Sequence, residues 1–233
     1  MAFTGYVFKS RKEIEPFAEC SDGGVTFNWA KKHARRLLCT VICGYVEMEK
    51  QDHEPPKFYN SMLMVDPDGQ VVCNPRKTFL YETDKPWATA GDGFISLFCP
   101  ALKKNVSLGI CMDINPYNFT APFDKYEFGN YVVKEHPSEL VIFSCAWNDF
   151  DSEQEDVMPT LQYWASRLTP ITEAIQMGAY GFKDCYFICS NRTGTENGVH
   201  FVGASCVLSL KKPEIISSAS RNEEVVLQVT LPI

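Results

Sequence analysis

Cys111 is the residue of this chain best placed for covalent chemistry, because it stands where an apolar run turns polar. It lies in LGICMDINPYNF, residues 108–119, in which Pro116 prevents a strand from continuing through the turn. Ligands of open α/β sheets bind at strand ends, where a thiol on a tight turn can attack a carbonyl or nitrile carbon while backbone N–H groups face the developing oxyanion. The alternative is an inert core side chain, since cysteine is among the most buried residue types.

Lys77 is the second residue that could take part in such a reaction. It stands in NPRKTFLY, where Pro, Phe, Leu and Tyr predict partial burial. An ammonium group close to a cysteine favours the thiolate and stabilises negative charge on an attacked carbonyl. A solvated surface lysine is the alternative interpretation.

The first half of the chain predicts the elements that would position Lys77. Residues 24–38, GVTFNWAKKHARRLL, carry apolar side chains at helical spacing, and residues 37–47 form a nearly continuous apolar run, typical of a strand covered on both faces. A polar, proline-bearing loop is expected over residues 49–60. Asp66-Pro67-Asp68-Gly69 then joins two strand-like runs with the residues that a hairpin turn requires, so Lys77 lies just beyond a hairpin.

The second half alternates strands and helices around Cys111. Residues 159–182 place apolar side chains on one helical face, namely Leu161, Trp164, Ala165 and Leu168. The predicted strands cover residues 105–112, 139–147, 185–191, 200–210 and 224–233. No linker or internal repeat interrupts the alternation, so the sequence predicts one α/β domain over residues 1–233.

Composition excludes several classes of function. The net charge of −7 is spread over both halves, and the basic run KKHARR is short, which argues against a nucleic-acid surface. Ten scattered cysteines without a CxxC pair indicate reduced thiols, and four histidines outside metal-ligand spacing give no indication of zinc. We expect neither a metal nor another cofactor. With no apolar run of about 18–20 residues and no secretory signal at the start, we expect a soluble cytoplasmic protein without a membrane span.

Four segments in order, NPRKTFL, LGICMDINPY, SCAWND and NRTGTENGVHFVGAS, resemble the carbon–nitrogen hydrolase (nitrilase) superfamily over essentially the whole chain. Within it, TGYVFKSRKEIEPFAE, GYVE, RKTFLYETDKPW and GICMDINPYNFTAPFDKYEFGNY are most similar to the fungal protein N-terminal amidases. The resemblance implies a nitrilase-like α-β-β-α sandwich. It also implies removal of the side-chain amide from an N-terminal Asn or Gln of a protein or peptide, generating the acidic N-terminus read by a degradation pathway, the N-degron pathway.

The family mechanism, carried over by position, makes Cys111 the nucleophile. It attacks the amide carbon, ammonia leaves, and water hydrolyses the thioester. Lys77 and the backbone N–H of Met112 correspond to the donors that stabilise the tetrahedral oxyanion.

The family's proton-transferring glutamate usually stands in a Pro-Glu pair just ahead of a segment like MAFTGY, with which this chain begins. We therefore expect an N-terminally incomplete domain that lacks the first strand, first helix and second strand. The alternatives are a catalytically impaired nitrilase-like protein or partner subunit, or an amidase or nitrilase acting on small molecules.

A further family glutamate, between the lysine and the cysteine, has no clear counterpart. The nearest acids are Glu82, Asp84 and Asp92, and the sequence does not choose among them. Glu47 in GYVE could replace the missing base, but a strand-end carboxylate satisfied by backbone donors is the preferred interpretation.

Substrate binding is expected around the nucleophile. Asp113 and Asp149 could bind the substrate's α-ammonium group, or could simply cap turns. Trp147 and Asn148 could line the pocket, although an aromatic residue after a buried strand is more often core. NRTGTENG, residues 191–198, is expected to be a loop that shapes the pocket and in which Glu196 pairs with Arg192 or another cation. The family also makes a homodimer possible.

Overall fold

The computed structural model describes residues 1–150 and 155–232 of the 233-residue chain. The polypeptide divides into two compact units, each built on its own β-sheet. The first unit comprises residues 1–94 and 99–103, and the second comprises residues 95–98 and the chain from residue 104 onward. That the two units make one domain stays a prediction.

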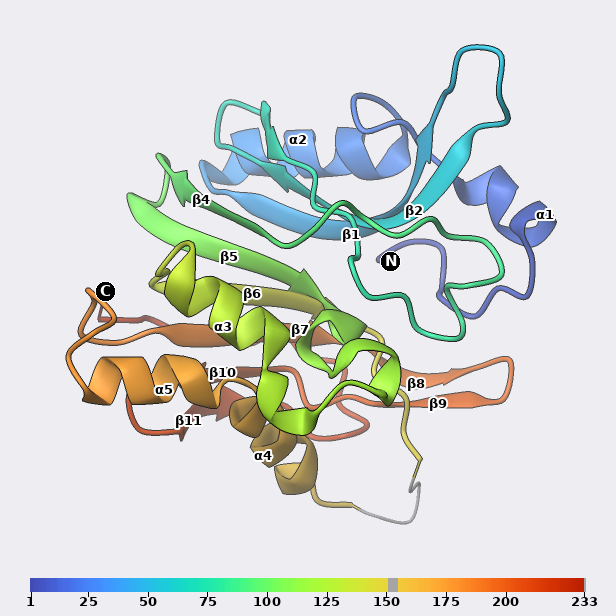
Figure 1. The fold of residues 1–233 in the computed structure, drawn as a ribbon. Helices are drawn as coiled ribbons and strands as arrows, with labels where there is room; N and C mark the ends of the chain where they lie inside the picture. Colours follow the sequence, from blue (N-terminus) through green and yellow to red (C-terminus); the bar gives the residue numbers. More distant parts are fainter. Residues whose placement is uncertain (151–154, 233) are drawn as a thin grey trace. The chain divides into compact units, whose positions relative to one another are not determined.

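The first unit is an antiparallel sheet covered by a helix on one face (Figure 1). Its strands β1 (Val41–Glu49), β2 (Lys57–Val65) and β3 (Val71–Cys73) pair in chain order. The amphipathic α2 (Val25–Leu37) packs Ala30 and Ala34 onto Tyr45, Leu63 and Val65, which confirms the predicted helix and strand. Before α2 lie a short helix α1 (Arg11–Ile14) and a 3-10 turn at Glu15–Phe17.

The predicted hairpin between β2 and β3 is confirmed. The carbonyl of Asp66 accepts the N–H of Gly69 at 2.9 Å, and Gly69 has a φ of 75°, a conformation that glycine adopts without strain. The loop expected over residues 49–60 is shorter than predicted, because β2 begins at Lys57 and pairs with the end of β1. The buried aromatic side chain of Phe58 explains why the strand starts so early.

The second unit is a mixed six-stranded sheet in the order β11-β10-β7-β6-β5-β4. Strands β5, β6 and β7 are parallel, whereas β10 and β11 continue the sheet in antiparallel fashion. The strands are β4 (Ile95–Cys99), β5 (Lys104–Ile110), β6 (Leu140–Cys145), β7 (Tyr186–Asn191), β10 (Cys206–Ser209) and β11 (Glu214–Ser218). Parallel strands joined by helices confirm the predicted α/β class.

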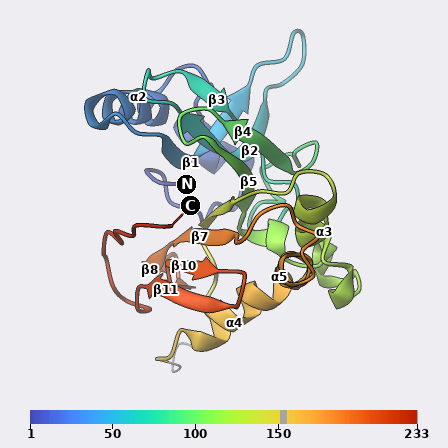
Figure 2. The same ribbon diagram turned by 90° about the vertical axis from the view of Figure 1, so that its left-hand side faces the viewer.

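Three helices pack on one face of this sheet: α3 (Glu127–Lys134), α4 (Met158–Arg167) and α5 (Thr169–Gln176) (Figure 2). Aromatic side chains pack α3 and α4 against the sheet: Phe128 of α3 contacts Phe143, and Trp164 of α4 contacts Phe187. The helical face predicted over residues 159–182 is therefore divided between two helices, with Pro170 in the first turn of the second. No helix within residues 1–150 and 155–232 has the length and apolarity needed to cross a membrane.

Two predictions in the C-terminal part are wrong. The run at residues 200–210 is broken by left-handed backbone at Gly203 and Ala204, which separates β9 (Val199–Val202) from β10. Residues 191–198 are more regular than the expected loop, because β8 (Thr193–Glu196) pairs with β9 across an Asn197-Gly198 turn. Arg192 and Glu196 form the predicted ion pair.

The closing strand predicted at residues 224–233 is also wrong. The last strand of the described residues is β11, which follows β10 after a short turn and pairs with it in antiparallel fashion. Residues 222–232 have no strand structure, and the side chain of Val226 is 91% exposed. An apolar alternation alone does not make a strand, since the backbone also needs a neighbour to pair with.

Candidate active site

The first unit holds Lys77 in a fully buried position. Beyond β3 the chain runs beside β2, so that the N–H of Met62 donates to the carbonyl of Pro75 and the N–H of Lys77 donates to the carbonyl of Asn60, at 2.9 and 2.8 Å. The Lys77 side chain has no exposed surface, which goes beyond the partial burial that the sequence predicts.

Asp84 is the counter-charge of Lys77. The ammonium Nζ lies 2.5 Å from Oδ2 of Asp84, whose side chain is also completely buried. The carboxylate accepts further hydrogen bonds from the Asn60 amide at 3.0 Å, from the backbone N–H of Tyr81 at 2.9 Å and from the Tyr6 hydroxyl. The hydroxyl of Tyr6 lies 3.3 Å from the carboxylate and 3.5 Å from the ammonium. A buried charge of this kind persists only when it is paired and hydrogen-bonded, so this arrangement fixes the direction of the lysine side chain.

The sequence alone did not choose Asp84 over its acidic neighbours. Glu82 and Asp92 are both exposed, whereas Asp84 begins a turn whose backbone N–H groups, from Trp87 and Ala88, donate to its carbonyl. The Asp-x-Pro-x order of TDKPWA was the available local signal, because Asp favours the start of such turns.

Glu47 forms a second polar cluster in the first unit. Its side chain is 4% exposed and accepts hydrogen bonds from Ser61 at 2.7 Å and from Arg76 at 2.5 and 2.9 Å. Arg76 also pairs with Glu49 at 2.9 Å and stacks on the Tyr59 ring, 3.7 Å from its centroid. The hydrogen bonds to Glu47 raise the pKa of Arg76. The preferred interpretation was correct that the Glu47 carboxylate is satisfied, but its donors are side chains rather than backbone groups.

The second unit holds Cys111 at a sharp turn. Strand β5 ends at Ile110, and Cys111 opens a 3-10 turn over Cys111–Ile114 with a φ of 48°. Positive φ is uncommon for a residue with a side chain and gathers at functional sites. Cys111 is partly exposed, as a reacting thiol requires. The predicted strand over residues 105–112 is therefore two residues too long.

Asp113 holds this turn together. Its carboxylate Oδ2 accepts the N–H of Ile110 at 2.9 Å, and the residue is 2% exposed. This is the turn-capping role that the sequence analysis gave as the alternative to substrate binding. Met112 is buried in the same turn. Gly109 is needed just before it, because a Cβ there would overlap the ring of Phe143.

Helix α4 anchors the turn from the other side. The Tyr163 hydroxyl donates to Oδ1 of Asn115 at 2.6 Å, and Nε of Arg167 donates to the carbonyl of Ile114 at 2.9 Å. Burial lowers the pKa of Arg167. Sequence reasoning missed both anchors. The only sequence feature that could have indicated them is the four-residue spacing of Tyr163 and Arg167, which places both on one face of a helix.

Residues 147–149 follow β6 and so lie at the same sheet edge as Cys111, because β5 and β6 are parallel neighbours. The N–H of Trp147 donates to Oδ1 of Asn191 at 2.9 Å, and its ring packs edge-on against Trp164. Asn148 bridges to Phe201, and Asp149 forms an ion pair with Arg221. The three residues are partly exposed.

Comparison with known proteins identifies the family that this chain resembles. A family model described as carbon-nitrogen hydrolase matches residues 1–122. A protein N-terminal amidase from Schizosaccharomyces pombe is 32% identical over 232 residues, which cover 93% of this chain and 78% of the relative. A protein N-terminal amidase from Saccharomyces cerevisiae is 37% identical over 163 residues, covering 63% of this chain and 35% of the relative.

A solved structure, that of an N-terminal amidase with an Asn-Glu-Ala peptide, matches with a TM-score of 0.77 at 22% identity. The match covers 94% of this chain and 84% of that one. At this level of identity the likeness establishes the fold, and it confirms the nitrilase-like fold class expected from the sequence.

Proposed function

This chain belongs to the carbon–nitrogen hydrolase family, and from that premise we propose that it hydrolyses the side-chain amide of Asn or Gln at the N-terminus of a protein, releasing ammonia. The observation that carries the proposal is the left-handed Cys111 turn at the end of β5, in a chain 32% identical to a protein N-terminal amidase. The product is the corresponding Asp or Glu side chain.

In this proposal the Cys111 thiolate attacks the amide carbon, and the tetrahedral oxyanion is stabilised by the Lys77 ammonium and the N–H of Met112. Collapse of the intermediate breaks the C–N bond, the leaving nitrogen takes a proton from water and departs as ammonia, and a thioester remains on Cys111. Water then hydrolyses the thioester to a carboxylate and restores the thiol. Asp84 acts as a positioning residue, because it aims the lysine and balances its charge.

We further propose that residues 147–149 line the substrate pocket and that Asp149 binds the substrate's α-ammonium group. Asp113 is the weaker candidate, since it is 2% exposed within the Cys111 turn, whereas Asp149 is partly exposed although it pairs with Arg221. We propose a cytoplasmic location, because the ten cysteines, all among the described residues, form no disulfide and the cytosol keeps thiols reduced. A homodimer is expected by analogy with the family.

The decisive experiment measures ammonia released by the purified chain from four substrates: an Asn-initiated peptide, the same peptide with an acetylated N-terminus, free asparagine and a small nitrile. Release from the unblocked peptide alone, abolished in Cys111→Ala, supports the proposal. Faster turnover of asparagine or the nitrile would replace it with a small-molecule amidase or nitrilase. Acylation of Cys111 by an activated ester without any turnover would identify a catalytically impaired family member.

A further inference from the structure

Four cysteines of the second unit lie in a row across neighbouring strands. Cys111 follows β5, Cys145 ends β6, Cys189 lies in β7 and Cys206 begins β10, and these strands are adjacent in that order. Phe143 pairs with Cys189 and Cys189 pairs with Cys206. Because side chains alternate along a strand, Cys145, two residues after Phe143, shares their face of the sheet.

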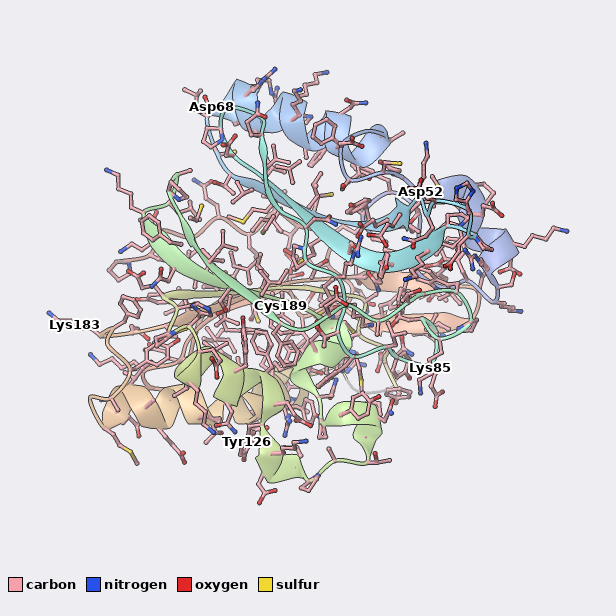
Figure 3. The ribbon with its side chains drawn as sticks, turned by 45° about the horizontal axis from the view of Figure 1, so that its top comes forward. Asp52, Asp68, Lys85, Tyr126, Lys183 and Cys189 are labelled. Carbon is pink, nitrogen blue, oxygen red and sulfur yellow. The ribbon has the colours of Figure 1, made fainter. Side chains whose placement is uncertain are left out.

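Cys145 is the thiol in this row that contacts a cysteine on either side. Sγ of Cys189 lies 3.6 Å from Sγ of Cys145, and Cys145 also has hydrogen bonds with the side chain and backbone of Cys111. Cys111 and Cys145 are partly exposed, whereas Cys189 and Cys206 are buried (Figure 3 labels Cys189 in the interior). The Cys111–Cys145 contact is therefore the end of the row that solvent reaches.

Strand register makes this contact suitable for a covalent bond. Ile110 pairs with Ser144, so Cys111, in the turn after β5, and Cys145, the last residue of β6, each directly follow a paired residue. Paired strands are about 4.7–4.9 Å apart at Ile110 and Ser144. Because each cysteine is the next residue along its chain, we expect their Cα atoms to lie near the range of roughly 4.4–6.8 Å that a disulfide spans. Cys145 and Cys189 are two residues out of register, which separates their backbones further.

We propose that Cys111 and Cys145 form a reversible peroxide-oxidation site. Hydrogen peroxide oxidises the Cys111 thiolate to a sulfenic acid and is itself reduced to hydroxide, which takes a proton to become water. The Cys145 sulfur then attacks the sulfenic sulfur, a disulfide forms, and the sulfenic hydroxyl leaves as water with the Cys145 proton. A dithiol reductant restores both thiols.

The two sulfurs lie in different environments, and this difference indicates that Cys111 reacts with peroxide first. Burial raises the pKa of the Cys145 thiol well above its ordinary value, although hydrogen bonds from Cys111 oppose that shift. Because the thiolate is the reactive form, Cys145 does not compete for peroxide and serves as the resolving thiol. The inference rests on the reactive Cys111 of the proposed function but not on its substrate. The disulfide would protect the nucleophile from irreversible oxidation.

A peptide map tests this without any measurement of turnover. The intact chain is treated with hydrogen peroxide, alkylated with iodoacetamide and digested with trypsin. Residues 105–125 and 135–167 are then separate tryptic peptides, each with a single cysteine, Cys111 and Cys145 respectively. We expect these two peptides to be disulfide-linked after peroxide and to separate after treatment with dithiothreitol.

Matched variants extend the test. Cys145→Ser is expected to lose the cross-link and to accumulate sulfinic acid at Cys111, which dithiothreitol does not reverse. Cys189→Ser, which removes the other thiol in contact with Cys145, is expected to cross-link as the unaltered chain does. Should the unaltered chain accumulate sulfinic acid at Cys111 without the cross-link, or link Cys145 to Cys189 instead, the inference is wrong. The map of the unaltered chain decides the matter even if a variant does not fold.

Discussion

Lys77 and Asp84 form an ion pair from which solvent is excluded, with 2.5 Å between Nζ and Oδ2 and no exposed surface on either side chain. Further hydrogen bonds, from Asn60, the backbone of Tyr81 and the Tyr6 hydroxyl, hold the carboxylate in place. The lysine is therefore rigid before any substrate arrives, and this rigidity leads to the first prediction.

Asp84→Asn should destabilise the protein by about 3–5 kcal/mol, because it leaves a buried ammonium without its counter-charge. In a preparation that hydrolyses Asn-peptides, the alkaline limb of the rate profile should also move to lower pH, since the ammonium is then easier to deprotonate. Urea unfolding and a pH series of kcat measure the two effects.

Glu139→Gln is the matched control, because it removes the charge from the less buried Lys104–Glu139 pair while keeping a side-chain oxygen that can accept the N–H of Asn105, and it should cost less than Asp84→Asn. A pH profile that Asp84→Asn leaves unmoved, despite the loss of stability, would mean that the acid has a structural role only.

Lys77→Met should slow the acylation of Cys111 by an activated ester about 10²–10³-fold, the usual effect of removing one oxyanion donor. Single-turnover kinetics read by mass spectrometry isolate this step from thioester hydrolysis. Lys85→Met, which alters an exposed lysine of the same segment, should acylate at the original rate. Equal rates in the two variants would remove Lys77 from the mechanism.

Glu47→Gln should lower the free energy of unfolding by about 1–3 kcal/mol, because Arg76 loses its charged hydrogen-bond partner. It should leave the pH dependence of turnover unchanged, since the carboxylate is occupied by Arg76 and Ser61. A fall in kcat of about 10²–10⁴-fold in a stable variant would instead identify Glu47 as the general base.

Glu49 should make part of the stability depend on pH. Hydrogen bonds from Arg76 and Tyr59 lower its pKa in the folded protein. A carboxyl group with a lowered folded pKa stabilises the fold above its unfolded pKa of about 4.3, and this contribution is lost as the pH falls through the folded value. Unfolding measured from pH 7 down to pH 3 should show a smaller acid-induced loss in Glu49→Gln than in the unaltered chain.

Asp149→Asn and Asp113→Asn should affect different kinetic parameters. The first should raise KM for an Asn-initiated peptide with little change in kcat, because it weakens the proposed hold on the α-ammonium group. The second should lower kcat and thermal stability together, because the N–H of Ile110 loses a charged acceptor at the Cys111 turn. If KM is unchanged in Asp149→Asn, another residue binds the ammonium group.

Local sequence determined the elements that carry these residues. The 3.6-residue spacing of apolar side chains specified α2, and the Asp-Pro-Asp-Gly turn specified the hairpin ahead of Lys77. The apolar run ending at Ile110 placed Cys111 at a strand end. Each of these features depends on residues a few positions apart, which is why they can be read without a structure.

Tertiary structure alone decided the partners. Asp84 rather than Glu82 or Asp92 faces Lys77, and side chains rather than backbone groups satisfy Glu47, because side-chain direction follows from packing between segments distant in sequence. The same reason explains the closing strand that did not form. Residues 224–232 have a strand-like composition, but the position beside β10 is held by β11, and a strand exists only where a neighbour accepts and donates its backbone hydrogen bonds.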